Sequence, residues 1–393
     1  MMKNSNPINF LKLTAAMLMS VAMPSVAAEV DVIQPADSLP ATTPWALKSL
    51  SQPPAFEWAE GDEVRSLFFE GETYQGKPTR VFAYYATPGT LAGDPSKDKN
   101  LPAIVLVHGG GGRAFPHWAK LWASRGYAAI AMDLSGKGAN NKRLPDGGPS
   151  QKDQVKFGSM DQPVTDQWTY HSVANVILAH SLIRSFPEVD PKRTAITGIS
   201  WGGYLTCIVA GLDDRFKAAV PVYGCGFLHE NSKWLGWFKK MTQDHRSKWI
   251  QLWDPSMYVG SAAMPMLFVN GGLDFAYPPD SHAKTYALVQ SEKNLHFVPN
   301  LRHGHVFDRP KAVEVFIDHH LKQEATLAKV TSVKTEATQI TAEVKSPEPL
   351  VKAQLYYTTG SLASGAKDRK WMSLPAAIDE FTIKAPLPPD DST

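Results

Sequence analysis

Residues 198–202 read Gly198-Ile199-Ser200-Trp201-Gly202, which is a Gly-x-Ser-x-Gly pattern. The residues before it, 193–197, form a short run rich in β-branched side chains and predict a strand. The residues after it, 203–210, are apolar and predict a helix. A serine on a sharp turn between a strand and a helix is a nucleophile elbow, in which small flanking residues let the chain pass close by. The pattern therefore predicts Ser200 as a nucleophile.

Apolar runs around this stretch predict a mostly parallel sheet. Residues 103–107 and 128–132 are apolar without alternation, as expected for strands that are covered on both faces. Segments 115–125 and 165–186 have helical character and separate the strands. Strands that alternate with helices indicate an α/β architecture. An antiparallel pair of strands is expected earlier in the chain, between residues 64 and 85.

Four consecutive glycines, residues 109–112, follow His108 at the end of the strand predicted at 103–107. Glycines in this place leave backbone N–H groups uncovered by Cβ atoms, and an oxyanion hole needs such donors. A phosphate-binding loop would end in Gly-Lys-Ser/Thr, which this segment lacks. We therefore expect the N–H of Gly110 or Gly111, together with that of Trp201, to form an oxyanion hole.

The glycine loop after His108, the lead-in Pro187-Glu188-Val189-Asp190-Pro191-Lys192-Arg193 and the Gly-x-Ser-x-Gly stretch resemble the α/β-hydrolase superfamily. The resemblance covers about residues 63–322 and points to the secreted branch that contains dienelactone hydrolases, acetylxylan esterases and prolyl oligopeptidases. It implies the α/β-hydrolase fold and a serine mechanism. It does not identify the substrate, because this branch includes esterases, peptidases and carbon–carbon hydrolases.

The resemblance also implies where the acid of a catalytic triad lies. Chain order in this superfamily is serine, then acid, then histidine. Asp274 lies in the loop after the apolar strand predicted at 266–269, where the family places its acid. Asp280 is a weaker candidate, because it lies beyond this tight loop.

The base is expected in the segment that begins at Pro299. Relatives commonly read Pro, three residues, then His-Gly-Phe, and this register identifies His303. His305 stands where the phenylalanine is expected, and it is an alternative base; His296, within the predicted strand, is interpreted as structural. A His-x-His pair can also bind a metal, but no third ligand cluster accompanies it, so we expect no metal and no cofactor.

Two segments are predicted to surround the site. Residues 134–163 are rich in Gly, Lys and Asp and predict a long loop that faces solvent or lines the entrance. Residues 226–260 lie where superfamily members carry a cap over the site. Tryptophan rings can stack on the apolar face of a sugar ring, so we expect the tryptophans of this insertion to bind substrate, with anchoring of the cap on the core as the alternative. They are Trp234, Trp237, Trp249 and Trp253.

The N-terminus has the features of a secretory signal peptide, which we assign to residues 1–28. Lys3 and Lys12 precede an apolar run at 13–23, and small residues suited to cleavage follow. The apolar run is too short to span a bilayer. We expect a secreted or periplasmic protein whose residues 29–62 form an extended arm.

The amino-acid composition changes after the predicted catalytic domain, which we place at residues 63–324. Residues 325–393 are rich in Thr and Val and predict a small immunoglobulin-like β-sandwich. This part resembles the C-terminal extension of PhoPQ-activated pathogenicity-related secreted hydrolases. The chain stops before the last strand or two of such a domain, which indicates truncation or a minimal sandwich. The strands are predicted at 329–333, 340–344, 353–357 and 381–384.

Charge and cysteine content restrict the partners and the chemistry. Lys and Arg number 40 and Asp and Glu 38, for a formal net charge of +2, so no broad basic face is implied and nucleic acid is not an expected partner. The two cysteines, Cys207 and Cys225, either form a disulfide or remain as buried thiols. Neither alternative supplies a metal site.

These observations predict a secreted serine esterase that acts through an acyl-enzyme on acetyl or similar esters of carbohydrates. A serine peptidase of the prolyl-oligopeptidase type is the first alternative. A non-catalytic protein that binds carbohydrate or a surface is the second, and the complete set of serine, acid and histidine argues against it. The oligomeric state is not predicted.

Overall fold

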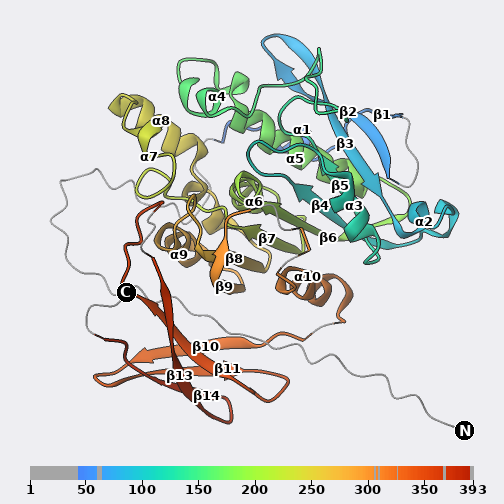
Figure 1. The fold of residues 1–393 in the computed structure, drawn as a ribbon. Helices are drawn as coiled ribbons and strands as arrows, with labels where there is room; N and C mark the ends of the chain where they lie inside the picture. The colour runs from blue at the N-terminus through green and yellow to red at the C-terminus, as the bar shows by residue number, and fades with distance from the viewer. Residues whose placement is uncertain are drawn as a thin grey trace, which may run out of the picture.

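The computed structural model describes residues 43–59, 64–304, 307–308, 310–324, 326–365 and 369–389. The predicted signal peptide and the first part of the predicted arm, up to residue 42, lie outside the described residues. Figure 1 shows a large sheet with helices on both of its faces and a second, smaller sheet at the C-terminal end of the chain.

Nine strands form the large sheet in the order β1-β2-β3-β5-β4-β6-β7-β8-β9. The strands from β5 to β9 along this order pair in parallel, and β1, β2 and β3 complete one edge by antiparallel pairing. The predicted parallel sheet and its early antiparallel pair are therefore confirmed. The bounds are Phe56–Ala59 (β1), Arg65–Tyr74 (β2), Lys77–Ala86 (β3), Leu101–Val107 (β4), Ala128–Met132 (β5), Val189–Ile199 (β6), Ala218–Val222 (β7), Met266–Leu273 (β8) and Lys293–Arg302 (β9).

Helices cover both faces of this sheet (Figure 1). On one face α5 and α6 contact each other and the central strands β4 and β6. On the other, α3 and α10 are linked by an ion pair of 2.9 Å between Arg125, just after α3, and Glu314 of α10. The bounds are Leu47–Leu50 (α1), Pro88–Leu91 (α2), Pro116–Ala123 (α3), Asp153–Gly158 (α4), Trp168–Arg184 (α5), Trp201–Leu212 (α6), Leu235–Phe238 (α7), Gln243–Trp253 (α8), Pro279–Leu288 (α9) and Ala312–Lys322 (α10).

The core explains why the central strands show no alternation of apolar and polar residues. Every residue of β5 and all but the first residue of β4 are buried. Helix α5 is likewise buried along nearly its whole length, since it lies between the sheet and neighbouring elements. Cys207 and Cys225 are buried free thiols, so the predicted alternative without a disulfide is correct.

Three local predictions need correction. The described part of the arm is not extended throughout, because residues 47–50 form the short helix α1, whereas residues 56–59 form the strand β1, paired antiparallel with β2. The strand before the elbow, predicted at residues 193–197, begins earlier, at Val189, and ends at Ile199. The loop at 134–163 contains the short helix α4. The arm forms a strand because Phe56 and Trp58 pack against Phe186, with ring centroids 5.4 and 5.7 Å away.

The C-terminal residues form five antiparallel strands in the order β10-β11-β14-β13-β12 (Figure 1). The predicted all-β class of this part is confirmed. The sequence analysis missed β13, which pairs with both β12 and β14. Pro375 within this strand lacks an N–H and weakens the strand signal. The bounds are Lys329–Thr335 (β10), Gln339–Lys345 (β11), Ala353–Thr358 (β12), Trp371–Asp379 (β13) and Thr382–Pro386 (β14).

Candidate active site

Ser200 stands at a sharp turn between β6 and α6, with φ 60° and ψ −119°. A non-glycine residue in this conformation is strained and is held there by its surroundings. A Cβ atom on Gly198 would lie 2.2 Å from the carbonyl oxygen of Gly202, and a Cβ on Gly202 would lie 1.9 Å from that of Val107. The two glycines of the pattern are therefore needed for the turn to close against the end of β4. The predicted elbow geometry is present.

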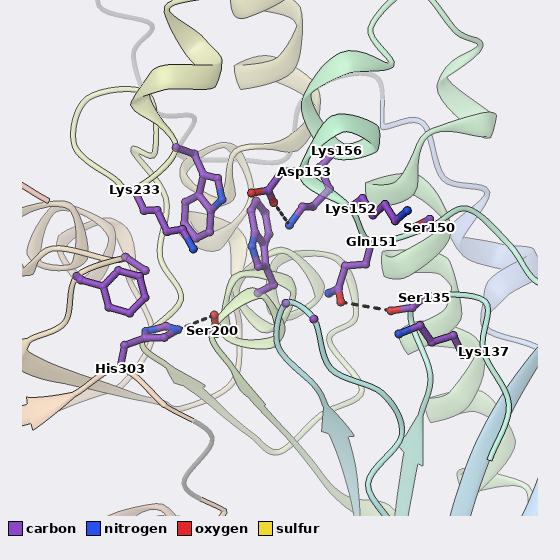
Figure 2. Close-up of a pocket in the computed structure, with 16 residues that line it drawn as sticks. Ser135, Lys137, Ser150, Gln151, Lys152, Asp153, Lys156, Ser200, Lys233 and His303 are labelled. Carbon is purple, nitrogen blue, oxygen red and sulfur yellow. Dashed lines mark hydrogen bonds and ion pairs between the residues drawn. The ribbon is translucent and has the colours of Figure 1, made fainter. Parts of the chain in front are cut away.

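Ser200, Asp274 and His303 lie at the carboxyl ends of β6, β8 and β9 and are joined by hydrogen bonds. The Nδ1 atom of His303 lies 2.7 Å from Oδ2 of Asp274, and its Nε2 atom lies 2.9 Å from Oγ of Ser200, as Figure 2 shows for the second contact. A carboxylate only accepts, so Nδ1 carries the proton that it donates to Asp274. The Nε2 atom is then free to accept the proton of the Ser200 hydroxyl.

Asp274 is held rigidly behind the histidine. Its carboxylate is fully covered, and its Oδ1 atom accepts hydrogen bonds from the backbone N–H of Ala276 (2.7 Å) and Tyr277 (2.9 Å). Close approach of β8 and β9 makes the pairing possible, since a Cβ on Gly271 would lie 2.2 Å from the carbonyl oxygen of Leu301. One carboxylate oxygen is thus fixed by the loop, and the other is left for His303.

The imidazole of His303 is confined by three aromatic rings. Tyr223 lies 4.9 Å away between ring centroids, Phe275 lies 5.2 Å away, and Tyr277 stacks at 6.0 Å. The side chain of His303 is 14% exposed, so its Nε2 edge remains within reach of the pocket. His305, the alternative base, lies outside the described residues. Asp280, the weaker acid candidate, instead accepts from the amide of Asn231 at 2.9 Å.

The candidate oxyanion donors lie beside Ser200. Trp201 is the first residue of α6, where a backbone N–H has no acceptor within the helix. Gly110 packs on its indole, since a Cβ on Gly110 would lie 2.6 Å from Cδ1 of Trp201. The loop is held by buried His108, whose Nε2 accepts from the N–H of Leu134 (2.9 Å) and whose Nδ1 therefore donates to the Gly109 carbonyl (2.8 Å). Burial lowers the pKa of His108 to about 4, so this support stays neutral.

A pocket of about 470 Å³ opens onto Ser200 and His303 (Figure 2). Gly110, Gly111 and Trp201 are part of its wall, so the predicted nucleophile, base and oxyanion donors share one cavity. The rest of the wall comes from residues 135–156 and from the loops that follow β7 and β8. These lining residues are Ser135, Lys137, Ser150, Gln151, Lys152, Asp153, Lys156, Lys233, Trp234, Phe275 and Ala276.

Within the described part of the chain, no group of three or more His, Cys, Asp or Glu side chains is arranged to hold a metal ion. In the same part, no helix is both long enough and apolar enough to cross a bilayer.

Two family models and a curated relative match parts of the chain. Residues 60–236 match the family model of acetyl xylan esterases (AXE1), and residues 235–368 match that of the PhoPQ-activated pathogenicity-related protein. The chain is 25% identical over 248 residues to an uncharacterized peptidase, YuxL, of Bacillus subtilis. That match takes in 56% of this chain and 35% of the peptidase, so the chain spans about a third of that relative.

Solved structures show the same fold. An acetyl xylan esterase from Paenibacillus sp. R4 superposes with a TM-score of 0.54 at 22% identity, over 70% of this chain and 92% of that one. Acetyl xylan esterase 1 from Thermoanaerobacterium sp. JW/SL YS485 gives a TM-score of 0.54 at 17% identity, over 73% and 96% of the two chains. The chain therefore has the α/β-hydrolase fold. The match of residues 60–236 to the acetyl xylan esterase family supports a hydrolase of the esterase type.

The tryptophans of the insertion lie in different surroundings. Trp234 lines the pocket. Trp249 and Trp253 are 0% and 1% exposed, and their Nε1 atoms donate to the Lys156 carbonyl (3.0 Å) and to Oε1 of Gln167 (2.8 Å). The prediction that they bind sugar is therefore wrong for these two, because protein covers both rings; they anchor the insertion on the core. Trp237 stacks on Phe157 at 5.9 Å and does not line the pocket.

The sequence analysis missed the polar side chains of the pocket. Lys137, Gln151, Lys156 and Lys233 are part of the wall, and none had been a candidate. The available signal was the lysine-rich loop at 134–163, which was expected to line the entrance or face solvent. A loop this long gives no periodicity from which the direction of its side chains can be predicted.

The C-terminal part of the chain contacts the loop that carries Asp274 directly. Arg369 is 4% exposed and donates to the carbonyl oxygens of Gly272 (3.1 Å) and, in its own loop, Ala363 (2.9 Å). The indole of Trp371, at the start of β13, also donates to the Gly272 carbonyl at 3.0 Å. The loop that carries Asp274 is thus tied to the segment between β12 and β13.

We expect the Arg369→Ala variant to lower kcat for p-nitrophenyl acetate by about tenfold with little change in KM. The variant loses the hydrogen bonds of the buried guanidinium and leaves the Gly272 carbonyl with Trp371 as its remaining side-chain donor, at a cost of about 1–3 kcal/mol, and this loosens the loop that carries Asp274. Steady-state kinetics of Arg369→Ala beside Lys370→Ala, an exposed neighbour, measures the effect. An unchanged kcat in a folded Arg369→Ala protein would show that the contact does not position the acid.

Proposed function

We propose that this α/β-hydrolase is a secreted serine esterase that hydrolyses acetyl or similar esters of carbohydrates through an acyl-enzyme. The observation that carries the proposal is the chain of hydrogen bonds from Asp274 to His303 to Ser200, which opens onto a pocket. The match of residues 60–236 to acetyl xylan esterases supports the ester class. Secretion rests on the signal-peptide features of residues 1–28.

In the proposed mechanism the base accepts the proton of the serine. Nε2 of His303 takes the proton from Oγ of Ser200 as the oxygen attacks the ester carbonyl. Asp274 accepts from Nδ1–H, keeps the imidazole in the required tautomer and stabilises the imidazolium that forms. His303 then gives its proton to the leaving alcohol, and a water molecule activated by the same nitrogen releases the acid from Ser200.

The negative charge of the tetrahedral intermediate requires donors next to Ser200. We assign them to the backbone N–H of Trp201 and to that of Gly110 or Gly111, which face the same pocket. The loss of one such donor typically costs about 3–4 kcal/mol of transition-state stabilisation. Backbone donors need no reorganisation during the reaction, since the elbow and the His108 contacts hold them.

The aromatic residues that line the pocket are consistent with a sugar as the alcohol part of the ester. Phe275 lines the pocket and is 46% exposed, so its ring is available to a sugar; Trp234 also lines the pocket but is 3% exposed. A serine peptidase is the second candidate, and the similarity to the Bacillus subtilis peptidase favours it. Both reactions pass through the same acyl-serine.

Hydrolysis of p-nitrophenyl esters from acetyl to octanoyl, beside acetylated xylan and a prolyl p-nitroanilide, tests the proposal. We expect turnover of the acetyl ester and release of acetate from the polymer, with kcat/KM falling as the acyl chain lengthens. Cleavage of the anilide with little ester turnover would replace the esterase by a peptidase. No turnover of any of these compounds by folded protein would contradict both.

A further inference from the structure

The pocket beside Ser200 is lined by four lysines and one aspartate. Lys156 is paired with Asp153 at 2.8 Å, with its side chain 2% exposed. Lys137, Lys152 and Lys233 have no carboxylate within ion-pair distance in the described part of the chain. Asp274 is not part of the lining, and its charge faces His303. The free cavity therefore carries an excess of positive charge although the whole chain has a formal net charge of only +2.

Two of these lysines reach the cavity from separate elements. Figure 2 shows Lys233 and Lys137 pointing into the pocket from opposite sides, with Ser200 and His303 nearer to Lys233. Lys233 follows β7 in the insertion and lies 5.3 Å from the ring centroid of Phe275. Lys137 comes from the loop after β5. A charged group on a bound ester would therefore meet positive charge on either side of the reacting carbonyl.

The backbone of the loop that carries Lys137 is held in place by hydrogen bonds from two side chains. Oδ1 of buried Asp133 accepts from the backbone N–H of Ser135 (2.8 Å) and of Lys137 (2.7 Å). Arg143 donates to the Ser135 carbonyl at 3.0 Å from the other side. Loops held by buried side chains keep their direction without a ligand, so the lysine is pre-positioned.

A second observation, independent of charge, also indicates a ligand. Gln151 is 6% exposed and lines the pocket, and its Oε1 accepts from Oγ of Ser135 at 3.3 Å. Its Nε2 is buried and has no hydrogen-bond partner in the structure. In Figure 2 the amide of Gln151 lies between Ser135 and the loop beside Ser200. A buried donor without a partner is costly, and a ligand oxygen would satisfy it.

We propose that the ester substrate carries an anionic oxygen group, a carboxylate or a sulfate on an acidic sugar, which Lys137, Lys233 and Gln151 bind. This inference deepens the proposed function and rests on it. The ammonium groups of the two lysines and the Nε2 atom of Gln151 can each donate a hydrogen bond to a ligand oxygen. The bonds from the ammonium groups are stronger when that oxygen carries negative charge, so the lysines favour an anionic ligand over a neutral one. The lysines also raise the local concentration of an acidic polymer at the pocket.

Hydrolysis of 4-acetoxybenzoate and of its neutral methyl ester by the whole protein tests the proposal. We expect kcat/KM, corrected for the rate of each compound with hydroxide, to favour the anion by about tenfold at low salt, as expected for one or two close charges in a partly solvated site. The preference falls as ionic strength rises, because salt screens the attraction. Acetylated polygalacturonate is likewise expected to be deacetylated faster than acetylated xylan.

Variants show whether the lysines cause the preference. We expect Lys137→Met combined with Lys233→Met to reduce the ratio between the two esters to about one, whereas Lys239→Met, at an exposed position that does not line the pocket, keeps it. Competition by glucuronate or by glucose 6-sulfate, each against glucose, distinguishes carboxylate from sulfate. Stronger inhibition by either anion supports the proposal.

The failure of this inference differs from the failure of the proposed function. If both acetoxy esters are hydrolysed with equal corrected kcat/KM and neither anion inhibits more than glucose, the anionic substrate is wrong and the esterase stands. A preference that persists in the Lys137 and Lys233 double variant would also overturn the assignment to these lysines. If neither ester is hydrolysed, the proposed function itself fails.

Discussion

The Ser200→Ala variant is expected to lose ester hydrolysis almost completely, with kcat for p-nitrophenyl acetate falling by about 10⁵–10⁶. In the wild type, the Oγ atom of Ser200 is the group that would attack the ester carbonyl, and it lies 2.9 Å from Nε2 of His303, which would take its proton. Donors for the oxyanion remain in the variant, so a small rate above that of water is expected to persist. Stopped assays over hours are needed to measure it.

Ser124→Ala is a matched control, since Ser124 is an exposed residue that follows α3, away from the pocket. We expect wild-type kinetics from this control and an unchanged melting temperature from both variants. Alanine has a Cβ atom as serine does, so the strained backbone at position 200 is equally costly in the wild type and in Ser200→Ala. Ser200→Ala with the activity of the wild type would mean that the elbow is not the site of the reaction.

The second large effect is expected for Asp274→Asn, with kcat falling by about 10⁴. The same change in a serine protease triad has an effect of this size, because it stabilises the wrong tautomer of the histidine. Here the N–H groups of Ala276 and Tyr277 require an acceptor at Oδ1, so the amide nitrogen of the new side chain would face His303. Nδ1 would then accept, Nε2 would carry the proton, and Ser200 would have no base.

Asp280→Asn is the control for this variant. Asp280 was the weaker acid candidate, and it lies against the amide of Asn231 at 2.9 Å and not against His303. We expect its kcat to stay within about threefold of the wild type, as for a substitution away from the reacting groups. Parallel kinetics of the two variants decide between the carboxylates, and a reversed order of effects would assign the acid to Asp280.

The central sheet and the elbow could be predicted because local sequence determines them. Apolar runs without alternation mark strands covered on both faces, and the Gly-x-Ser-x-Gly pattern lies between such a strand and a helix. The structure adds why both glycines are required, since a Cβ at Gly198 or Gly202 would lie within about 2 Å of a backbone oxygen. Asp274 and His303 could be proposed from chain order, while their distance from each other and from Ser200 depends on the register of β8 and β9.

Other features depend on contacts that no local pattern encodes. Trp249 and Trp253 were expected to contact the substrate, but both are buried in the core. The sequence could not distinguish the two places, because an aromatic residue near a site is equally compatible with a pocket wall and with the core. The backbone of the loop that carries Lys137 is held by Asp133 and Arg143, whose roles arise only once the loop is folded. The docking of Arg369 on the acid loop joins residues nearly a hundred positions apart.

Sequence spacing alone did not decide between His303 and His305 as the base. The spacing from Pro299 favoured His303, and the replacement of the usual phenylalanine kept His305 as an alternative. Hydrogen bonds of 2.7 Å to Asp274 and 2.9 Å to Ser200 support His303 as the base. His305 lies outside the described residues, so a direct comparison of the two requires an experiment.

Labelling with a fluorophosphonate, followed by intact mass and peptide mapping, shows whether Ser200 is an activated nucleophile, because the reagent reacts with a serine that a neighbouring base activates. We predict one adduct per chain, on the peptide that contains Ser200, with labelling lost in Ser200→Ala and greatly slowed in His303→Ala but not in His305→Ala. An adduct on another residue, or ester hydrolysis that continues while Ser200 stays unlabelled, would contradict the account. Loss of labelling in His305→Ala with normal labelling in His303→Ala would move the base to His305.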